Sequence, residues 1–446
     1  MHIALVCVAA AAGLALAALA GSKGASPVST PSPTPVSSPS PSPSATAVVT
    51  AVATPTPSPA ISNVPEFDEQ LAMAQDHELA VDIGVRAAGT GGERAAADYI
   101  RDELASYGYD AQEQAFPIQI YQGYNTALQD VSSGRFFNAS PMTYSAAGDV
   151  TAEAVLVSGP GEPADFPPGT QGSVALIERG TLSFQDKVAN AEAAGASAVV
   201  IYNNQPGEYT ATLRGESSVP AITISQEDGA ILRGLMAAGA VRLRVSVSAN
   251  IGEGQSQNVL AEAPGGGECQ VVIGGHYDSV PAGPGANDNG SGTSVVIEMA
   301  RVLAARGETD GLCIALFGSE EAGLLGSQYY VSQLTEAQRG AIRGYLNFDM
   351  LGVGDGWPVV GSDALTALAV EKAAAIGVSA YAADSPPNVG SDHASFINAG
   401  IPAVLFNCFC DPNYHTAADR YEFLQPDRLK VAGQIGLMMA DALLAG

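Results

Sequence analysis

The chain has 446 residues, of which 46% are hydrophobic, so it is long enough for two or three globular domains. Its formal net charge of −27 argues against nucleic acid and anionic membranes as partners, because both require basic surfaces.

The amino-terminal part carries export and spacer signals. Residues 3–20 form an apolar run that ends in Ala-Leu-Ala, which predicts a signal peptide at 1–20. No Lys or Arg precedes this run, so an uncleaved membrane anchor is the alternative. Residues 21–60 are rich in Pro, Ser and Thr and predict a disordered linker. We therefore expect a secreted or cell-surface protein with no stable membrane insertion after signal cleavage.

The folded part begins with helical patterning. Apolar residues recur at helical spacing from Ala95 to Tyr107, and Gly108 ends the predicted helix. A short strand should follow, and residues 61–132 form the first part of a domain. Residues 133–253 form another unit, with predicted strands at 172–180 and 197–204 around a helix at 184–196.

From residue 254 to 446 the first domain resumes, with continuous apolar strands that alternate with helices. The strands are expected at 269–278, 311–321, 344–349 and 401–407, and the helices at 290–307, 363–378 and 427–444. This pattern predicts an α/β fold with a mixed, mostly parallel central sheet covered by helices on both faces.

Cysteines outside the signal segment are even in number, which is compatible with disulfides outside the cell. Cys269 and Cys313 begin two of the predicted strands at matching distances from the strand ends, so we prefer a bridge between them. Cys408 and Cys410 either form a tight local bridge or remain unbridged.

Polar side chains follow these strands at their carboxyl ends, where ligands bind in parallel sheets. They are His276, Asp278, Asp288, Glu320, Glu321, Asp349, Tyr414 and His415. An isolated Glu-Glu pair is more often a solvated helix start. Because several candidate ligands share one sheet edge here, we expect a metal site. Two histidines with three carboxylates suit Zn²⁺, and a pair of such ions can activate a water.

These residues lie in segments that resemble the motif series of the M28 family of dizinc aminopeptidases. The segments are GHYDS, GANDNGSG, FGSEEAGLLGS, NFDM, SDHASF and YHTAAD, and GVRAAGTGGERAAADYI is similar to the opening helix of the family. Residues 172–204 resemble the protease-associated (PA) domain inserted in some members, with Thr181 where many PA domains have Cys. The resemblance implies a zinc exopeptidase fold with an inserted β-rich PA domain at 133–253, which we expect to cover one side of the site.

The resemblance also implies a role for each matching residue. His276 and Asp349 would hold one zinc ion, Glu321 and His415 a second, and Asp288 would bridge the two. Glu320 would be the general base, Asp278 would orient His276, and Tyr414 would donate a hydrogen bond to the oxyanion. Asp392 would shape the amine pocket, and His393 would support the site without binding metal.

The implied function is hydrolysis of peptides with a free N-terminus. Two alternatives stay open. One is a related hydrolase such as a carboxypeptidase, which needs a cation for the substrate carboxylate; between Asp349 and His415 the only Lys or Arg is Lys372. The other is a metal-free binding protein that acts through its PA domain, but none of the five ligand positions is missing.

Overall fold

The computed structural model describes residues 66–445 apart from 214, 264–266, 308, 385–389 and 409. The signal peptide and the linker predicted at 1–20 and 21–60 lie outside the described residues. Within the described part, no helix has the length and apolar character needed to cross a membrane.

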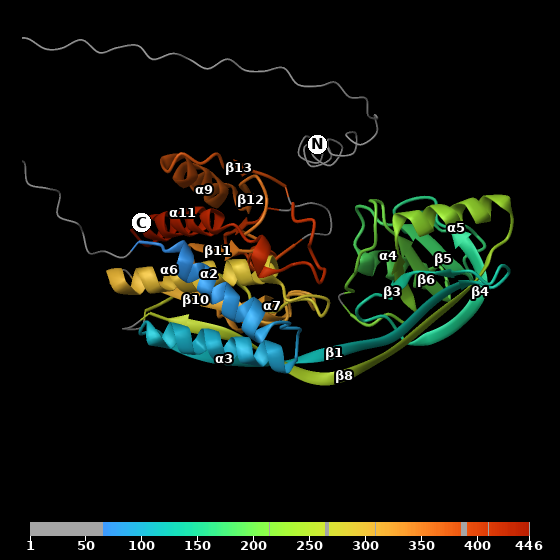
Figure 1. Cartoon of the computed structure of the whole chain (residues 1–446), viewed down its shortest axis with the longest axis horizontal. Helices are drawn as coiled ribbons and strands as arrows, with labels where there is room; N and C mark the ends of the chain where they lie inside the picture. Colours follow the sequence, from blue (N-terminus) through green and yellow to red (C-terminus); the bar gives the residue numbers. More distant parts are fainter. Residues whose placement is uncertain are drawn as a thin grey trace, which may run out of the picture. The chain divides into compact units, whose positions relative to one another are not determined.

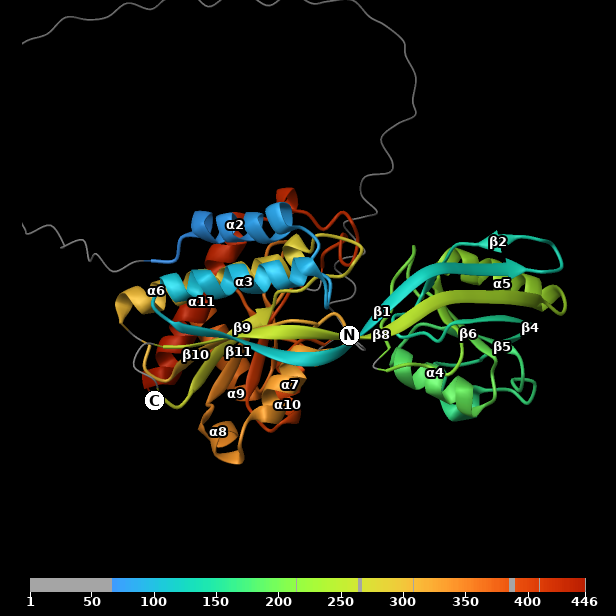
Figure 2. The ribbon, with the colours of Figure 1, turned by 90° about the horizontal axis from the view of Figure 1, so that it is seen from below.

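A mixed sheet forms the centre of the larger domain (Figures 1 and 2), with strand order β13-β12-β14-β11-β9-β10-β8. Its central strands are parallel: β9 (Val271–His276), β10 (Leu312–Phe317), β11 (Gly344–Phe348) and β14 (Ala403–Phe406). β8 (Arg242–Glu262) runs antiparallel to β10, and β12 (Pro358–Gly361) runs antiparallel to β14 and parallel to β13 (Tyr381–Ala382). The predicted mixed, mostly parallel sheet is confirmed.

Helices cover both faces of this sheet. Alternate residues of each strand point to opposite sides, so each face has its own apolar cluster for helices to pack against. In β10, Leu312, Ile314 and Leu316 face one apolar cluster, whereas Cys313, Ala315 and Phe317 face another. The first cluster contains residues of α2 (Glu69–His77), α3 (Gly91–Ser106), α6 (Gly292–Arg306), α9 (Asp363–Ala375) and α11 (Pro426–Ala445). The second contains residues of α7 (Leu325–Gln333) and α10 (His393–Asn398). Shorter helices lie at η1 (Glu78–Ile83), η3 (Ala286–Ser291), α8 (Glu336–Ala341) and η4 (Tyr421–Phe423).

The inserted unit has its own sheet, which continues from β8 in the order β4-β5-β6-β7-β3. Its elements are β2 (Phe136–Phe137), β3 (Ala139–Pro141), β4 (Gly148–Leu156), η2 (Pro163–Asp165), β5 (Val174–Glu178), α4 (Phe184–Ala193), β6 (Ala198–Tyr202), β7 (Ala221–Ile224) and α5 (Gln226–Ala238). β5, β6 and β7 are parallel and mainly apolar, as expected for a sheet buried on both sides.

Two long strands join the two parts, and here the prediction of a short strand after Gly108 is wrong. β1 (Asp110–Asp130) and β8 each have 21 residues and pair antiparallel from Asp110↔Glu262 to Asp130↔Leu243, with an irregularity between Gly123 and Asn125. The first residues of β8 pair with β4 and its last residues pair with β10, so the expected boundary at 253/254 falls inside one strand. The middle of β8, residues 248–257, is rich in polar residues and glycine, and β1 contains Pro117 and Gly123, so the sequence did not indicate two strands of this length.

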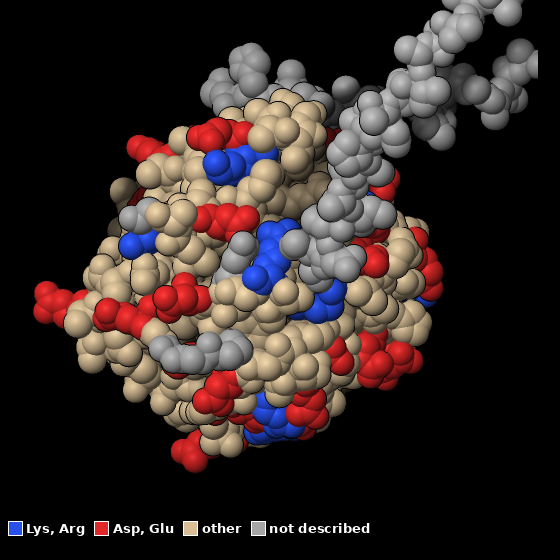
Figure 3. All heavy atoms as spheres, turned by 90° about the vertical axis from the view of Figure 1, so that its left-hand side faces the viewer, with Lys and Arg blue, Asp and Glu red and all other residues tan. Residues whose placement is uncertain are grey.

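A bridge between Cys269 and Cys313 is present, with a Cα–Cα distance of 5.6 Å, and it confirms the preferred pairing. Cys408 and Cys410 are thiols, so the local bridge is not formed. On the face that Figure 3 shows, acidic side chains surround smaller groups of basic ones, in keeping with the net charge of −27.

Candidate metal centre

The carboxyl ends of the parallel strands lie level with one another. Phe317 is the register partner of His276, and Phe348 is the partner of Phe406, so the residues after each strand emerge at the same edge. Gly275 permits a close approach of β9 to the end of β11, because a Cβ atom there would lie 2.4 Å from the carbonyl oxygen of Phe348. His276 is thereby placed beside Asp349, the residue that follows Phe348.

Two groups of metal-ligand side chains meet at this edge. His276, Glu320 and Asp349 form the first cluster, and Asp288, Glu321 and His415 form the second. Within each cluster the candidate ligand atoms lie within 4.8 Å of one another. The structure therefore brings together all five predicted metal ligands and the predicted base.

Asp288 connects the two clusters. Its Oδ1 atom lies 3.3 Å from Nε2 of His276, and its Oδ2 atom lies 3.2 Å from Nε2 of His415. His276 Nε2 also lies 3.5 Å from Oδ1 of Asp349, and His415 Nε2 lies 3.0 Å from Oε2 of Glu321. One carboxylate thus faces both imidazoles, which is the geometry that a bridging ligand needs.

Both glutamates lie in a tight turn after β10. Ser319 has a φ of 54° and starts the turn, and the carbonyl oxygen of Glu320 accepts hydrogen bonds from the N–H groups of Gly323 and Leu324. The buried Asp278 carboxylate accepts the N–H groups of Glu320 and Glu321 at 3.0 and 3.2 Å.

Asp278 also faces the histidine of the first cluster. Its Oδ1 atom lies 3.4 Å from Nδ1 of His276, so the same carboxylate that holds the glutamate turn lies against the ring nitrogen that faces away from the cluster. This placement fits the predicted orienting role.

Tyr414 contacts a residue of the second cluster, whereas His393 lies outside both clusters. The Tyr414 ring stacks on the His415 ring with a centroid distance of 3.7 Å, and 44% of Tyr414 remains exposed. His393 begins α10, is buried, and belongs to neither cluster.

The site is crowded with acidic groups whose pKa values are perturbed. Burial raises the pKa of Glu321 to about 7, and burial with the charge of Glu321 raises the pKa of Glu320 well above its usual value. Burial alone would lower the pKa of His276 and His415, but the facing carboxylates raise both well above the usual value. Protons take up part of this excess negative charge, and a divalent cation would do so more completely.

The residues present fit zinc. Oδ1 of Asp349 and Oε1 of Glu321 are buried without a hydrogen-bond partner in the described part of the chain, so each has a lone pair to offer. Imidazole nitrogens with carboxylate oxygens form a donor set that suits Zn²⁺.

Three buried residues that hold the site in place were not predicted from the sequence. Arg86 is fully buried and donates to the carbonyl oxygens of Tyr277, Pro284 and Gly285, which flank the His276 and Asp288 segments. Asp419 accepts the N–H groups of Asn287 and Asp288 at 2.8 and 3.0 Å. Glu93 accepts a hydrogen bond from Ser319. Arg86 and Glu93 lie in GVRAAGTGGERAAADYI and Asp419 lies in YHTAAD, two segments of the motif series, but the local sequence does not indicate their contacts.

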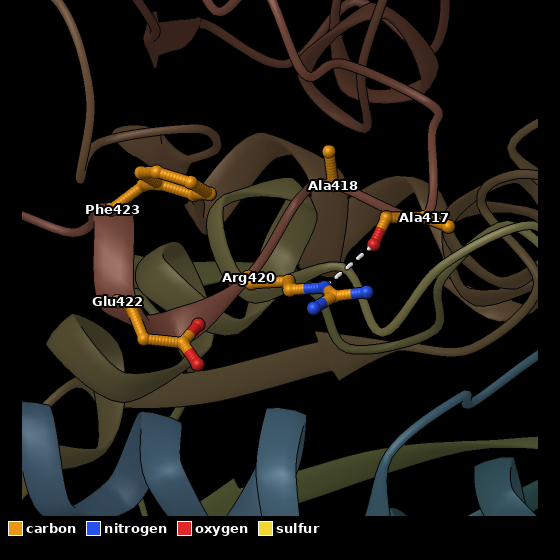
Figure 4. A pocket seen from close by; sticks show the side chains of 5 residues that line it. All are labelled: Ala417, Ala418, Arg420, Glu422 and Phe423. Carbon is orange, nitrogen blue, oxygen red and sulfur yellow. Dashed lines mark hydrogen bonds between the residues drawn. The ribbon is translucent and has the colours of Figure 1, made fainter.

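A surface pocket of about 510 Å³ is lined by residues that come shortly after His415 in the chain. Ala417, Ala418, Arg420, Glu422 and Phe423 line it, and Nε of Arg420 donates to the carbonyl oxygen of Ala417 (Figure 4). Its lining is mainly apolar, and its chemistry adds no ligand to either cluster.

A mostly parallel sheet with a paired carboxylate–histidine site at its carboxyl edge defines a metallohydrolase of the zinc exopeptidase type. Comparison with known families agrees with this class. Residues 258–440 match peptidase family M28, and residues 146–232 match the PA domain.

Individual relatives identify the family. The chain is 32% identical over 398 residues to aminopeptidase YwaD of Bacillus subtilis, with 83% of each protein covered. Its structure resembles that of BSAP, a zinc aminopeptidase from Bacillus subtilis, with a TM-score of 0.69, 32% identity, and coverage of 85% of this chain and 95% of the other. The chain therefore belongs to peptidase family M28.

A fungal relative matches over a shorter stretch. Leucine aminopeptidase 2 of Arthroderma otae is 38% identical over 272 residues, which cover 60% of this chain and 54% of the fungal protein. The chain thus spans about half the length of this curated relative.

Proposed function

We propose that this protein is a secreted, zinc-dependent aminopeptidase that releases the first residue of peptides with a free N-terminus. The observation that carries the proposal is the pair of clusters that Asp288 connects. Each cluster contains one glutamate of the Glu320–Glu321 turn. The names of the Bacillus subtilis and fungal relatives support the same reaction.

In this proposal His276 and Asp349 would hold one zinc ion, Glu321 and His415 would hold a second, and Asp288 would serve both. Two zinc ions there would supply Lewis-acid activation of the attacking water and of the peptide carbonyl. Asp278 keeps the His276 ring in place and fixes the backbone of the glutamate turn through the N–H groups of Glu320 and Glu321.

Glu320 moves the proton. Its carboxylate accepts a proton from the attacking water and then delivers it to the leaving amine. Tyr414 donates a hydrogen bond to the carbonyl oxygen as negative charge develops there. Partial burial of the Tyr414 side chain against this acidic site, together with the charges of Asp288, Glu321 and Glu320, raises its pKa well above the usual value, so its hydroxyl stays protonated and can donate.

The charge of the site favours a substrate ammonium group over a carboxylate. Burial raises the pKa of Asp392 to about 7, and this residue lies close enough to His276 and Asp349 for their charges to affect it. Lys372, the cation that a carboxypeptidase would need, instead pairs with Glu371 on α9 at 2.9 Å. We therefore propose amine recognition.

Two features support the proposed export. Residues 3–20 have the composition of a signal-peptide core. The Cys269–Cys313 bridge is typical of proteins that fold in an oxidising compartment.

The test is an assay of the zinc-loaded protein on matched peptides. We expect release of the first residue from a free peptide, none from the same peptide with an acetylated N-terminus, and two zinc ions per chain by metal analysis. Equal cleavage of the acetylated peptide, or carboxyl-terminal release, would overturn the aminopeptidase proposal. Release of the first residue by a protein with one zinc ion would overturn the dizinc part alone.

A further inference from the structure

Glu93 is a buried carboxylate in the first turn of α3 that the proposed reaction does not use. It is 1% exposed and lies 226 residues before Ser319 in the chain. In most helices a glutamate at this position bonds only to the nearby helix start. Part of this side chain does so, because its Oε2 atom accepts the N–H group of Gly89 at 2.7 Å.

The second oxygen of Glu93 points away from its own helix. Oε1 accepts hydroxyl hydrogen bonds from Ser319 at 3.0 Å and from Ser256 at 2.8 Å. The packing around this oxygen is close, since a Cβ atom on Gly318 would lie 2.9 Å from it and 2.6 Å from the carbonyl oxygen of Gln257. The carboxylate therefore fills a site between β8 and the end of β10.

Ser319 is the residue through which Glu93 reaches the metal centre. It immediately precedes Glu320, and its φ of 54° is a left-handed conformation that non-glycine residues adopt at some cost in free energy. The carbonyl oxygen of Ser319 accepts the N–H group of Leu325 at 3.1 Å, which closes the same turn. The side-chain bond to Glu93 holds this residue from outside the turn.

We propose that Glu93 is a positioning residue for the Glu320–Glu321 turn and acts through the hydroxyl of Ser319. This inference rests on the proposed function, since it assumes that the position of Glu320 sets the rate. Asp278 holds the turn through the backbone of the two glutamates, and Glu93 holds it one residue earlier. The first turn of α3 is thereby connected to the turn that carries the proposed base.

The chain offers a matched pair of variants. Ser319→Ala removes the hydroxyl that links Glu93 to the turn, whereas Ser256→Ala removes a hydroxyl from the same carboxylate oxygen but no hydrogen bond of the turn. Glu93→Gln forms the third variant, because an amide cannot accept hydrogen bonds at both of its terminal atoms. Each is measured as the zinc-loaded full chain for metal content, kcat and KM on a free peptide, and hydrogen exchange of the peptide 318–325.

Ser319→Ala and Glu93→Gln should lower kcat about tenfold or more with little change in KM, because a small misplacement of a reacting group is costly. Both should speed amide exchange in 318–325 while zinc content stays at the wild-type level. Ser256→Ala should leave all of these quantities near wild type. Equal effects of Ser319→Ala and Ser256→Ala, or a fall in kcat that follows a loss of zinc, would overturn the proposal.

Hydrogen exchange separates this inference from the proposed function. If the wild-type protein does not act on free peptides, the proposed function fails and the positioning of a catalytic group fails with it, while faster exchange in the two variants would still report the structural link. If the wild type is active and the variants exchange faster with an unchanged kcat, only the positioning role is wrong.

Discussion

Glu320 and Glu321 are neighbours in the chain, yet each belongs to a different cluster. Because Ser319 is left-handed and Asp278 holds both N–H groups, the two carboxylates leave the turn toward different histidines. Glu320 lies with His276 and Asp349, where a carboxylate could either bind metal directly or act on the water. The proposed roles require the second choice for Glu320 and metal binding for Glu321.

Glutamine substitutions separate these roles. Glu320→Gln should keep both zinc ions and lower kcat by about 10² to 10⁴, since an amide cannot accept the water proton. Glu321→Gln should lose zinc, because a neutral amide oxygen is a poorer ligand than a carboxylate. Metal analysis and turnover on the two purified variants provide the measurement. Loss of zinc in Glu320→Gln together with retention in Glu321→Gln would reverse the two assignments.

His393 gives the site a pH dependence of stability. Burial lowers the pKa of His393 from its usual 6.5 to about 4, so the unfolded chain binds the proton more readily than the folded one. Its contribution to stability is complete above pH 6.5 and is lost as the pH falls toward 4. By pH 5 the loss should be on the order of 2 kcal/mol.

The variant His393→Gln tests this pH effect. Denaturant unfolding of the metal-free protein at pH 7 and pH 5 should show a smaller fall in the free energy of unfolding for the variant than for the wild type. Parallel falls in the two proteins would mean that His393 does not titrate in this range.

At the scale of elements, the sequence was informative where strands are buried on both faces. β9, β10, β11 and β14 are short, fully buried and mainly apolar runs, so their ends and the candidate ligands that follow could be located from the pattern. The length of β1 and β8 could not be predicted in this way, because Pro117 and Gly123 interrupt the apolar pattern of β1 and the middle of β8 is rich in polar residues and glycine.

The supporting residues were hidden for a different reason. Arg86, Glu93 and Asp419 act through contacts with segments far away in the chain, and nothing in their local sequence shows those partners. A buried charged residue at a helix start resembles an ordinary cap until its distant partner is known.

The disulfide joins the amino ends of two elements whose carboxyl ends carry the site. Cys269 precedes β9, and Cys313 lies in β10, 44 residues later. Replacing both residues by alanine should lower the free energy of unfolding by about 4 kcal/mol through the entropy of the unfolded chain, while kcat changes little. Denaturant unfolding without reductant gives the comparison with the wild type. A strong loss of kcat in a folded double variant would show that the bridge also supports the site.

At the scale of the whole molecule, the inserted unit is connected to the site in two ways. β1 and β8 continue from one sheet into the other without a break, so the insert is not attached by loops. Thr212 of the insert also donates its hydroxyl to the carbonyl oxygen of Glu321 at 3.4 Å, and Ala322 and Leu325 pack with apolar residues of the insert. The insert therefore touches the turn that carries both glutamates, which supports its expected role in covering the site.

Removing the insert tests that role, and β1 and β8 show where to cut. Gly123 pairs with Ala249, so residues 124–248 can be replaced by an Asn-Gly turn that closes a regular hairpin. The shortened protein should keep its zinc. Its kcat/KM for long peptides should rise relative to that for short peptides, because the insert residues that contact the turn at Glu321 are absent. Thr212→Val is the matched control, since it removes only the hydroxyl contact and should leave the ratio of kcat/KM for long and short peptides unchanged. If the shortened protein binds zinc fully but keeps the wild-type ratio, the insert does not limit substrate size; if it loses zinc, the insert is needed to form the metal centre itself.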